Sequence, residues 1–158
     1  MKRQLFICLL FAVFMASCAT GSILNDSSQD LSDINGKEWK LLGVFIDGKD
    51  TAFNRDNQPD QLSKDIFTLK LEDGTISGVG APNRYSGQYT PGANQTLGIT
   101  PLRSTLMASL FEPENLREHD FFTYVQNTRT WNLVNSKLNL EVLSVTGDGK
   151  PVRMVFGL

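Results

Sequence analysis

Cysteine, histidine and runs of basic residues are scarce in this 158-residue chain. It contains only two cysteines, Cys8 and Cys18, and one histidine, His119. We therefore expect no internal disulfide, and a zinc site would have to combine His119 with carboxylates alone, which is rare. Because the basic residues form no run and are outnumbered by acidic residues, 15 to 17, we expect no binding to nucleic acid.

Long hydrophobic runs are also absent, with one exception near the amino terminus. Leu5–Met15 is an unbroken apolar run that follows Lys2-Arg3 and precedes the small residues 16–18, which is the order of regions in a secretory signal. As a helix, this run would span about 16 Å, roughly half of a bilayer core of about 30 Å. We therefore do not expect it to anchor the protein as a transmembrane segment.

The end of this signal, Met15-Ala16-Ser17-Cys18, resembles a bacterial lipobox, in which an apolar residue and two small residues precede a cysteine. Met at the first position departs from the more usual Leu. The pattern predicts cleavage before Cys18 and acylation of Cys18, whose acyl chains would hold the protein on a membrane. Ala19 favours the outer membrane, facing the periplasm. The alternative is a plain secretory signal in which Cys18 has no role.

These patterns divide the chain into three regions. Residues 1–17 are predicted to be a lipoprotein signal peptide, and residues 18–35, rich in Ser, Asp and Asn, a flexible tether. Residues 36–158 are predicted to be the folded domain. We expect a monomer without cofactor or metal, which contacts the membrane through acylated Cys18 and has an envelope protein as its partner.

Alternation of apolar and polar residues predicts a mainly β domain of about eight short antiparallel strands. The segments that carry the pattern are Trp39–Ile46, Phe67–Leu71, Thr75–Val79, Tyr85–Thr90, Leu97–Leu102, Arg129–Asn135, Leu138–Val142 and Val152–Phe156. Asp47-Gly48, Asp73-Gly74 and Asn135-Ser136 mark turns between them. The polar segment Thr51–Asp65 is predicted to be a loop.

The period of the apolar residues changes only once, at Glu118–Asn127. There Phe121 and Phe122 lie on one face of a predicted helix, while Glu118 and Asp120 face solvent. Many short strands with a single helix predict an antiparallel β-barrel, open or partly closed, or a strongly curved sheet, with the helix packed across it.

We identify no set of residues suited to catalysis. His119 is flanked by Glu118 and Asp120, but adjacent residues on a helix point about 100° apart, so the three cannot converge as a relay. Gly78-Val79-Gly80 does not continue as a Gly-x-Gly-x-x-Gly motif and precedes no predicted helix. We therefore expect the protein not to be an enzyme.

The segment Gly78–Thr90 predicts a sharp corner between two strands, because it holds three glycines, a proline and a polar cluster. Two roles remain open for Asn83 at this corner. Its side chain can bond to nearby backbone groups, or it can form a partner-facing patch together with Arg84 and Tyr85.

At this corner and on either side of it, the sequence resembles the META domain family, which includes HslJ-like bacterial lipoproteins. The match runs from about Gly36 to Phe156, and it rests on five pieces in order: Gly36–Leu41, Asp73–Gly78, Asn83–Tyr89, Thr105–Ala108 and Glu118–Trp131. The resemblance implies a lipocalin-like antiparallel barrel with one helix. Stress response, motility, secretion and antibiotic tolerance are associated with the family, without a defined activity.

The sequence departs from the family pattern at two cysteines. One family cysteine precedes the Asn of the Asn-Arg-Tyr stretch and another follows Thr-Arg-Met-Ala, whereas this chain has Pro82 and Ser109 there, and Leu106 in place of the arginine. If the family cysteines pair with each other, their joint loss is self-consistent. No thiol or redox role can be transferred to this chain.

Two functions of different classes follow from these patterns. The first is a non-enzymatic envelope lipoprotein that supports envelope integrity, stress response or a secretion or assembly partner. The alternative is a carrier for a small apolar ligand or lipid, in which Phe121, Phe122 and Trp131 line a cavity. Filling the core is the more frequent role of such side chains.

Overall fold

Antiparallel β-strands dominate the computed structural model, which describes residues 29–57, 66–108, 113, 115–142 and 149–158. These residues form ten strands, one α-helix and two short 3-10 helices. In chain order the elements are η1 (Leu31–Asp33), β1 (Glu38–Ile46), β2 (Lys49–Asn54), η2 (Arg55–Asn57), β3 (Thr68–Glu72), β4 (Thr75–Val79), β5 (Arg84–Pro91), β6 (Leu97–Ile99), β7 (Arg103–Ser104), α2 (Glu118–Gln126), β8 (Thr128–Val134), β9 (Lys137–Val142) and β10 (Val152–Gly157).

Strand β1 joins the two halves of the sheet. It pairs with β10 along one edge, and along the other with β3 through Glu38–Lys40 and then with β2 through Gly43–Ile46. Trp39, Leu41 and Val44 of this strand are buried. A register shift after Leu41 moves the inward-facing positions by one residue, which explains why the strand is apolar on both faces in the sequence.

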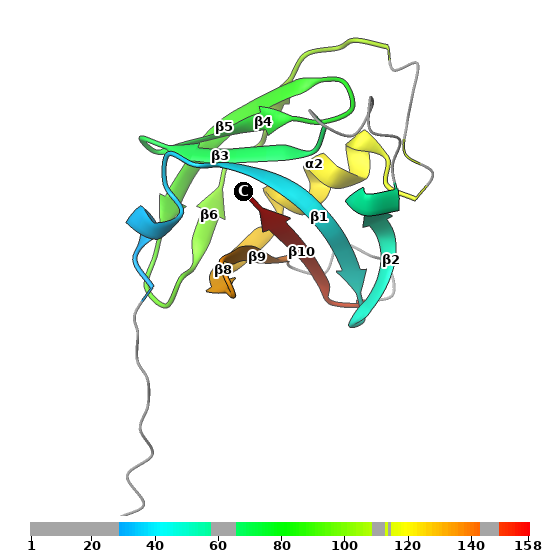
Figure 1. Cartoon of the computed structure of the whole chain (residues 1–158). Helices are drawn as coiled ribbons and strands as arrows, with labels where there is room; N and C mark the ends of the chain where they lie inside the picture. The colour runs from blue at the N-terminus through cyan, green and yellow to red at the C-terminus, as the bar shows by residue number, and fades with distance from the viewer. Residues whose placement is uncertain (1–28, 58–65, 109–112, 114, 143–148) are drawn as a thin grey trace, which may run out of the picture.

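The sheet curls into a nearly closed barrel (Figure 1). Its hydrogen-bonded neighbours follow the order β6-β5-β4-β3-β1-β10-β9-β8. The two end strands then meet, because Thr96 forms an isolated bridge with Thr130 and the N–H of Trp131 donates to the Gln95 carbonyl at 2.9 Å. This path of eight strands with a single helix confirms the predicted mainly β fold.

Helix α2 packs its apolar face against the barrel interior. Phe121, Tyr124 and Val125 are buried, and their spacing places them on one side of the helix. The Phe121 ring centroid lies 4.8 Å from that of Phe67, which immediately precedes β3. The helix spans the predicted segment to within one residue and lies across the barrel, as the amphipathic pattern predicts.

The prediction of a loop at Thr51–Asp65 is wrong for its first part. Strand β2 continues to Asn54 and η2 spans Arg55–Asn57, whereas residues 58–65 lie outside the described residues. Pairing with β1 supplies the backbone hydrogen bonds of β2 whatever the polarity of the local sequence. Together with the two-residue β7, this strand accounts for ten strands where about eight were predicted.

The folded part also begins before Gly36. Residues 29–35, which composition places in the tether, include η1, and Ile34 is fully buried. The indole N–H of Trp39 donates to the Ile34 carbonyl at 3.0 Å, and the side-chain amide of Gln29 exchanges hydrogen bonds with the Leu133 backbone at 2.7 and 2.6 Å. The bonds to Leu133 join residues 104 positions apart, and composition alone does not detect such contacts.

Candidate functional site

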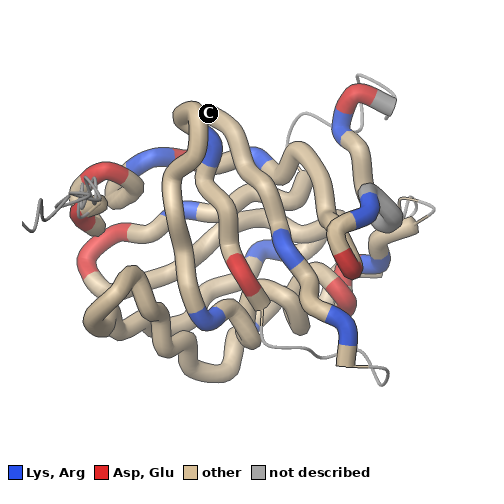
Figure 2. Tube along the Cα trace, turned by 90° about the horizontal axis from the view of Figure 1, so that it is seen from below, with Lys and Arg blue, Asp and Glu red and all other residues tan. Residues whose placement is uncertain are grey.

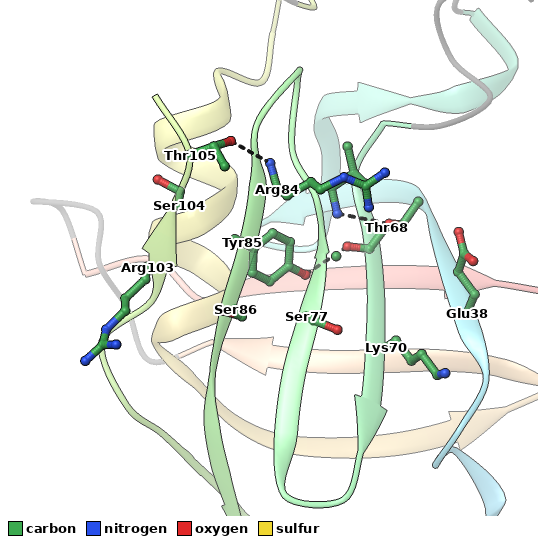
Figure 3. Close-up of a pocket in the computed structure, with 12 residues that line it drawn as sticks. Glu38, Thr68, Lys70, Ser77, Arg84, Tyr85, Ser86, Arg103, Ser104 and Thr105 are labelled. Carbon is green, nitrogen blue, oxygen red and sulfur yellow. Dashed lines mark hydrogen bonds between the residues drawn. The ribbon is translucent and has the colours of Figure 1, made fainter. Parts of the chain in front are cut away.

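A groove of about 540 Å³ runs across the outer face of β3, β4, β5 and β7 (Figure 3). Hydroxyl-bearing and charged side chains line it, together with Gly78 and Val79. The polar and charged residues on which its chemistry depends are Glu38, Lys70, Ser77, Arg84, Ser86 and Arg103.

Strand register places most of these side chains in one row. Glu38 lies opposite Lys70, Lys70 opposite Ser77, Ser77 opposite Ser86, and Ser86 opposite Arg103. Residues directly opposite each other on antiparallel strands project to the same face of the sheet. Because neighbouring strands are about 4.8 Å apart, the backbones of Lys70 and Arg103 lie roughly 14 Å apart, with two serines between them.

Gly78 and Tyr85 form the floor of the groove. A Cβ atom at Gly78 would overlap the backbone carbonyl of Thr68 and press on the Tyr85 ring, so only glycine fits. Tyr85 is 3% exposed, and its hydroxyl donates to the Thr68 carbonyl at 2.8 Å. The Thr68 hydroxyl accepts from the N–H of Val79 at 3.1 Å. Burial raises the pKa of the Tyr85 phenol above its ordinary value, so the floor is uncharged at neutral pH.

The groove carries three basic side chains and one acidic one. Lys70 pairs with Glu72 at 2.8 Å and lies opposite Glu38 in the register. The side chains of Arg84 and Arg103 have no hydrogen bond or ion pair with any residue that the structure describes. Figure 3 shows Arg84 extending across the groove toward β3, whereas Arg103 points away from it. The uncompensated positive charge is therefore at the β5–β7 end.

Asn83 is buried and holds the corner to two other segments. Its amide nitrogen donates to Glu118 Oε2 at 2.7 Å and to the backbone carbonyl of Met107 at 3.1 Å. Its side-chain oxygen accepts hydrogen bonds from the Thr105 hydroxyl at 2.8 Å and from the backbone N–H of Met107 at 2.7 Å. Asn83 and Tyr85 thus point inward and only Arg84 is exposed, so the three do not form the predicted partner-facing patch.

The prediction that Glu118 faces solvent is wrong. Its Oε1 accepts the backbone N–H groups of Ala81 and Asn83 at 2.5 and 2.6 Å. A Cβ atom at Gly80 would collide with this carboxylate, so the close approach requires glycine. Helical periodicity correctly placed Glu118 on the polar face of α2, but it could not show that the corner packs against that face.

The side chains next to His119, where we expected no catalytic relay, make contacts of their own. His119 is exposed on α2, and Asp120 pairs with Arg117 at 2.9 Å. The carboxylate of Glu118 is bound to the corner. Within the described part of the chain, no three His, Cys, Asp or Glu residues gather as metal ligands.

The three residues of the predicted apolar cavity pack against other side chains. The Phe121 ring lies 4.8 Å from Phe67 and 5.8 Å from Tyr85 between centroids, and the Phe122 ring lies 5.2 Å from Tyr85. Trp131, on β8, is 3% exposed. Contacts of this kind occupy the space that an apolar ligand would need.

Residues 1–28, which include the predicted signal peptide and the predicted lipidation site Cys18, lie outside the described residues, and so does Ser109, one of the two positions where the family has cysteine. Among the residues that are described, no helix is long and apolar enough to cross a bilayer.

Sequence reasoning did not identify Lys70, Ser77, Ser86 and Arg103 as members of one groove. Each occupies a polar position within or next to a predicted strand, which is a signal that the sequence contains. Their alignment depends on the registers of successive strand pairs, and a slip of one residue in any pair would move a side chain to the other face. The groove is therefore visible only in the folded chain.

Comparisons with known proteins agree with the barrel. The family model of the META domain matches residues 32–154. Among solved structures, the chain is similar to the crystal structure of a DUF4847 family protein from Bacteroides vulgatus, with a TM-score of 0.55 and 12% identity, covering 78% of this chain and 93% of that one. At this identity the likeness shows the fold alone, and no curated protein matches the sequence. Because the family model covers most of the sequence and confirms the resemblance, the chain belongs to the META domain family.

Proposed function

We propose that this protein is a non-enzymatic lipoprotein of the cell envelope that supports envelope integrity, stress response or a secretion or assembly partner. The observation that carries the proposal is the segment Met15-Ala16-Ser17-Cys18 at the end of an apolar signal, ahead of a META domain. Acylation of Cys18 with more than one chain would retain the domain at a membrane surface, since a single chain gives only marginal binding.

The side-chain contacts near the lone histidine support a role without catalysis. The acidic neighbours of His119 bind other groups, because Glu118 accepts bonds from the corner and Asp120 pairs with Arg117. Tyr85 is buried and donates its hydroxyl to a backbone carbonyl. These groups contribute to the fold, which favours a binding or scaffolding role.

We further infer that the lipoprotein resides in the outer membrane, facing the periplasm, as a monomer that contacts an envelope protein. Ala19, rather than Asp, follows the cysteine. The barrel then lies in water beside the membrane, while the acyl chains on Cys18 supply the anchor.

Metabolic labelling with a palmitate analogue tests the anchor. Wild type and Cys8→Ala should incorporate the label, because Cys8 lies in the segment predicted to be removed. Cys18→Ala should lose the label and leave the membrane fraction. Label that persists in Cys18→Ala would contradict the proposal, and separation of inner from outer membranes in the same samples tests the location.

Crosslinking in cells tests the supporting role. Wild type and Cys18→Ala are crosslinked in parallel, purified under denaturing conditions and compared by mass spectrometry. We expect a discrete envelope protein to be enriched with the wild type only, because the acyl anchor brings the domain to its partner. Equal recovery of the same proteins with both variants would argue against a partner reached through the membrane anchor.

A further inference from the structure

The groove across β3, β4, β5 and β7 has the chemistry of an anion site. We propose that it binds a phosphate-bearing ligand, with Arg84 and Arg103 holding the phosphate and the hydroxyls of Ser77 and Ser86 holding adjacent polar atoms. This inference goes beyond the lipoprotein role and does not depend on the acylation of Cys18.

The charge of the groove is opposite to that of the chain. The whole sequence has a formal net charge of −2, and acidic and basic residues are interspersed around the barrel in the view of Figure 2. Within the described residues, the groove nevertheless holds two uncompensated arginines, Arg84 and Arg103, at its β5–β7 end. A concave surface lined with one sign of charge raises the local concentration of ions of the opposite sign.

The two arginines are close enough to share one anionic group. The N–H of Thr105 donates to the Arg84 carbonyl at 3.0 Å, which places these two residues opposite each other, and Arg103 lies two residues before Thr105. Diagonal neighbours of this kind on antiparallel strands are roughly 7–8 Å apart, within reach of two long side chains. Both arginines are exposed, so a change of rotamer can bring Arg103 in from the outward orientation seen in Figure 3.

The number of donors favours phosphate over a carboxylate. Each guanidinium offers two parallel N–H donors to the oxygens of an anion, and it stays charged at any physiological pH. One such pair already satisfies the two oxygens of a carboxylate, whereas a phosphate group has three free oxygens and a charge of about −2. Two arginines with the hydroxyl of Ser86, which lies on the same strand as Arg84 and directly opposite Arg103, therefore match a phosphate group better.

The rest of the groove predicts how the ligand lies. At the other end, the charge of Lys70 is balanced by Glu72 at 2.8 Å and by Glu38 opposite it. That end suits an uncharged, hydroxyl-bearing part of the ligand, which would lie over Ser77. The floor is neutral and rigid, because Tyr85 is buried and hydrogen-bonded to the Thr68 backbone. A phosphorylated polyol fits this arrangement, either free in solution or as the headgroup of a lipid.

Isothermal titration calorimetry on the full chain in a neutral detergent, at low ionic strength, tests the proposal. The probes are glycerol 3-phosphate, glycerol and short-chain phosphatidylglycerol phosphate, a lipid whose headgroup ends in a phosphomonoester. We expect saturable binding of at least one phosphate-bearing probe and none of glycerol. Binding of glycerol 3-phosphate indicates that the headgroup alone suffices, and binding of phosphatidylglycerol phosphate alone indicates a lipid ligand.

Variants of the two arginines then locate the site. Arg84→Ala and Arg103→Ala should each weaken binding about tenfold or more, since each removes charged hydrogen bonds. Arg84→Lys and Arg103→Lys keep the charge but lose the paired donors, and they should give intermediate affinities. Arg129→Ala, at an exposed arginine of β8, serves as the matched control and should leave affinity unchanged.

Two results would overturn the inference: no saturable binding of any phosphate-bearing probe by the wild type, or equal weakening by Arg129→Ala and the groove variants. Thermal unfolding of each variant checks whether the exposed substitutions leave the fold intact, which we expect. Palmitate labelling of Cys18 in the same variants should be unaffected, so failure of the phosphate site and failure of the membrane anchor are distinguishable.

Discussion

Asn83 and Glu118 lie 35 residues apart in the sequence, yet their side chains meet at 2.7 Å between Nδ2 and Oε2. The same carboxylate accepts the N–H groups of Ala81 and Asn83. It therefore ties the start of α2 to the corner between β4 and β5. In this chain, where Pro82 stands in the corner, hydrogen bonds to Glu118 hold the corner.

Glu118→Gln should lower the free energy of unfolding by about 1–3 kcal/mol, because the new amide turns a donor toward the Asn83 amide. Asn83 cannot flip to relieve this contact, since its oxygen already accepts two hydrogen bonds. Urea unfolding monitored by circular dichroism measures the loss. Asp120→Asn, which removes only an exposed pair with Arg117, should cost about 0.5 kcal/mol or less. Equal losses in the two variants would refute the assignment of Glu118 to the corner.

Gly78→Ala should destabilise the barrel by about 2–3 kcal/mol, because the added methyl group meets the fixed carbonyl of Thr68 and the Tyr85 ring. Gly98→Ala is the matched control, since a Cβ atom there has its nearest contact at 3.8 Å, the Thr90 carbonyl oxygen. We expect its stability to equal or slightly exceed that of the wild type. Thermal unfolding compares the two variants, and a stable Gly78→Ala protein would show that the groove floor is less tightly packed than described.

Arg55→Ala should lower the free energy of unfolding by about 2–3 kcal/mol. Its guanidinium donates to the carbonyls of Leu41 and Ile66 at 2.6 and 2.7 Å, and the substitution leaves both without this donor. Partial burial lowers the pKa of Arg55, which is consistent with a structural position. Arg129→Ala, at an exposed site, should change stability by less than about 0.5 kcal/mol. Similar urea midpoints for the two variants would contradict this role of Arg55.

Stability should fall at alkaline pH in a way that depends on Tyr85. Burial raises the pKa of its phenol above the ordinary value of 10.0. Below pH 10 the phenol is protonated in both states and its contribution is complete. Above pH 10 the unfolded chain loses the proton while the folded chain keeps it, so the free energy of unfolding falls by up to about 1.4 kcal/mol per pH unit for this group.

Tyr85→Phe provides the comparison for this pH dependence. It should cost about 1 kcal/mol at neutral pH, because the hydrogen bond to the Thr68 carbonyl is lost. Its stability should then decline less steeply than that of the wild type above pH 10. Urea unfolding between pH 8 and about 11 measures both slopes, and parallel slopes would assign the alkaline loss to other groups.

Local residue patterns were sufficient to predict most of the fold. Asp73 and Gly74 both adopt positive φ, 47° and 76°, in the tight hairpin that the Asp-Gly pair predicts. Asn135 and Ser136 do the same at 51° and 60°. Such turns depend on a few adjacent residues, and the inward or outward side of a strand depends on simple alternation. By contrast, β2 is mostly polar, and its backbone hydrogen bonds depend on pairing with β1, which local polarity does not predict.

The sequence by itself determined the expected lipobox at Cys18, most of the strands and the family, because these depend on residue types at short spacing. Only the tertiary structure decided that Asn83 and Glu118 join the corner to α2, and that Arg84 and Arg103 stand beside two serines in one groove. The physical reason is that these polar groups meet through strand register and packing between distant segments. Alternation along a single strand specifies which face a side chain takes, but it does not specify which neighbours share that face.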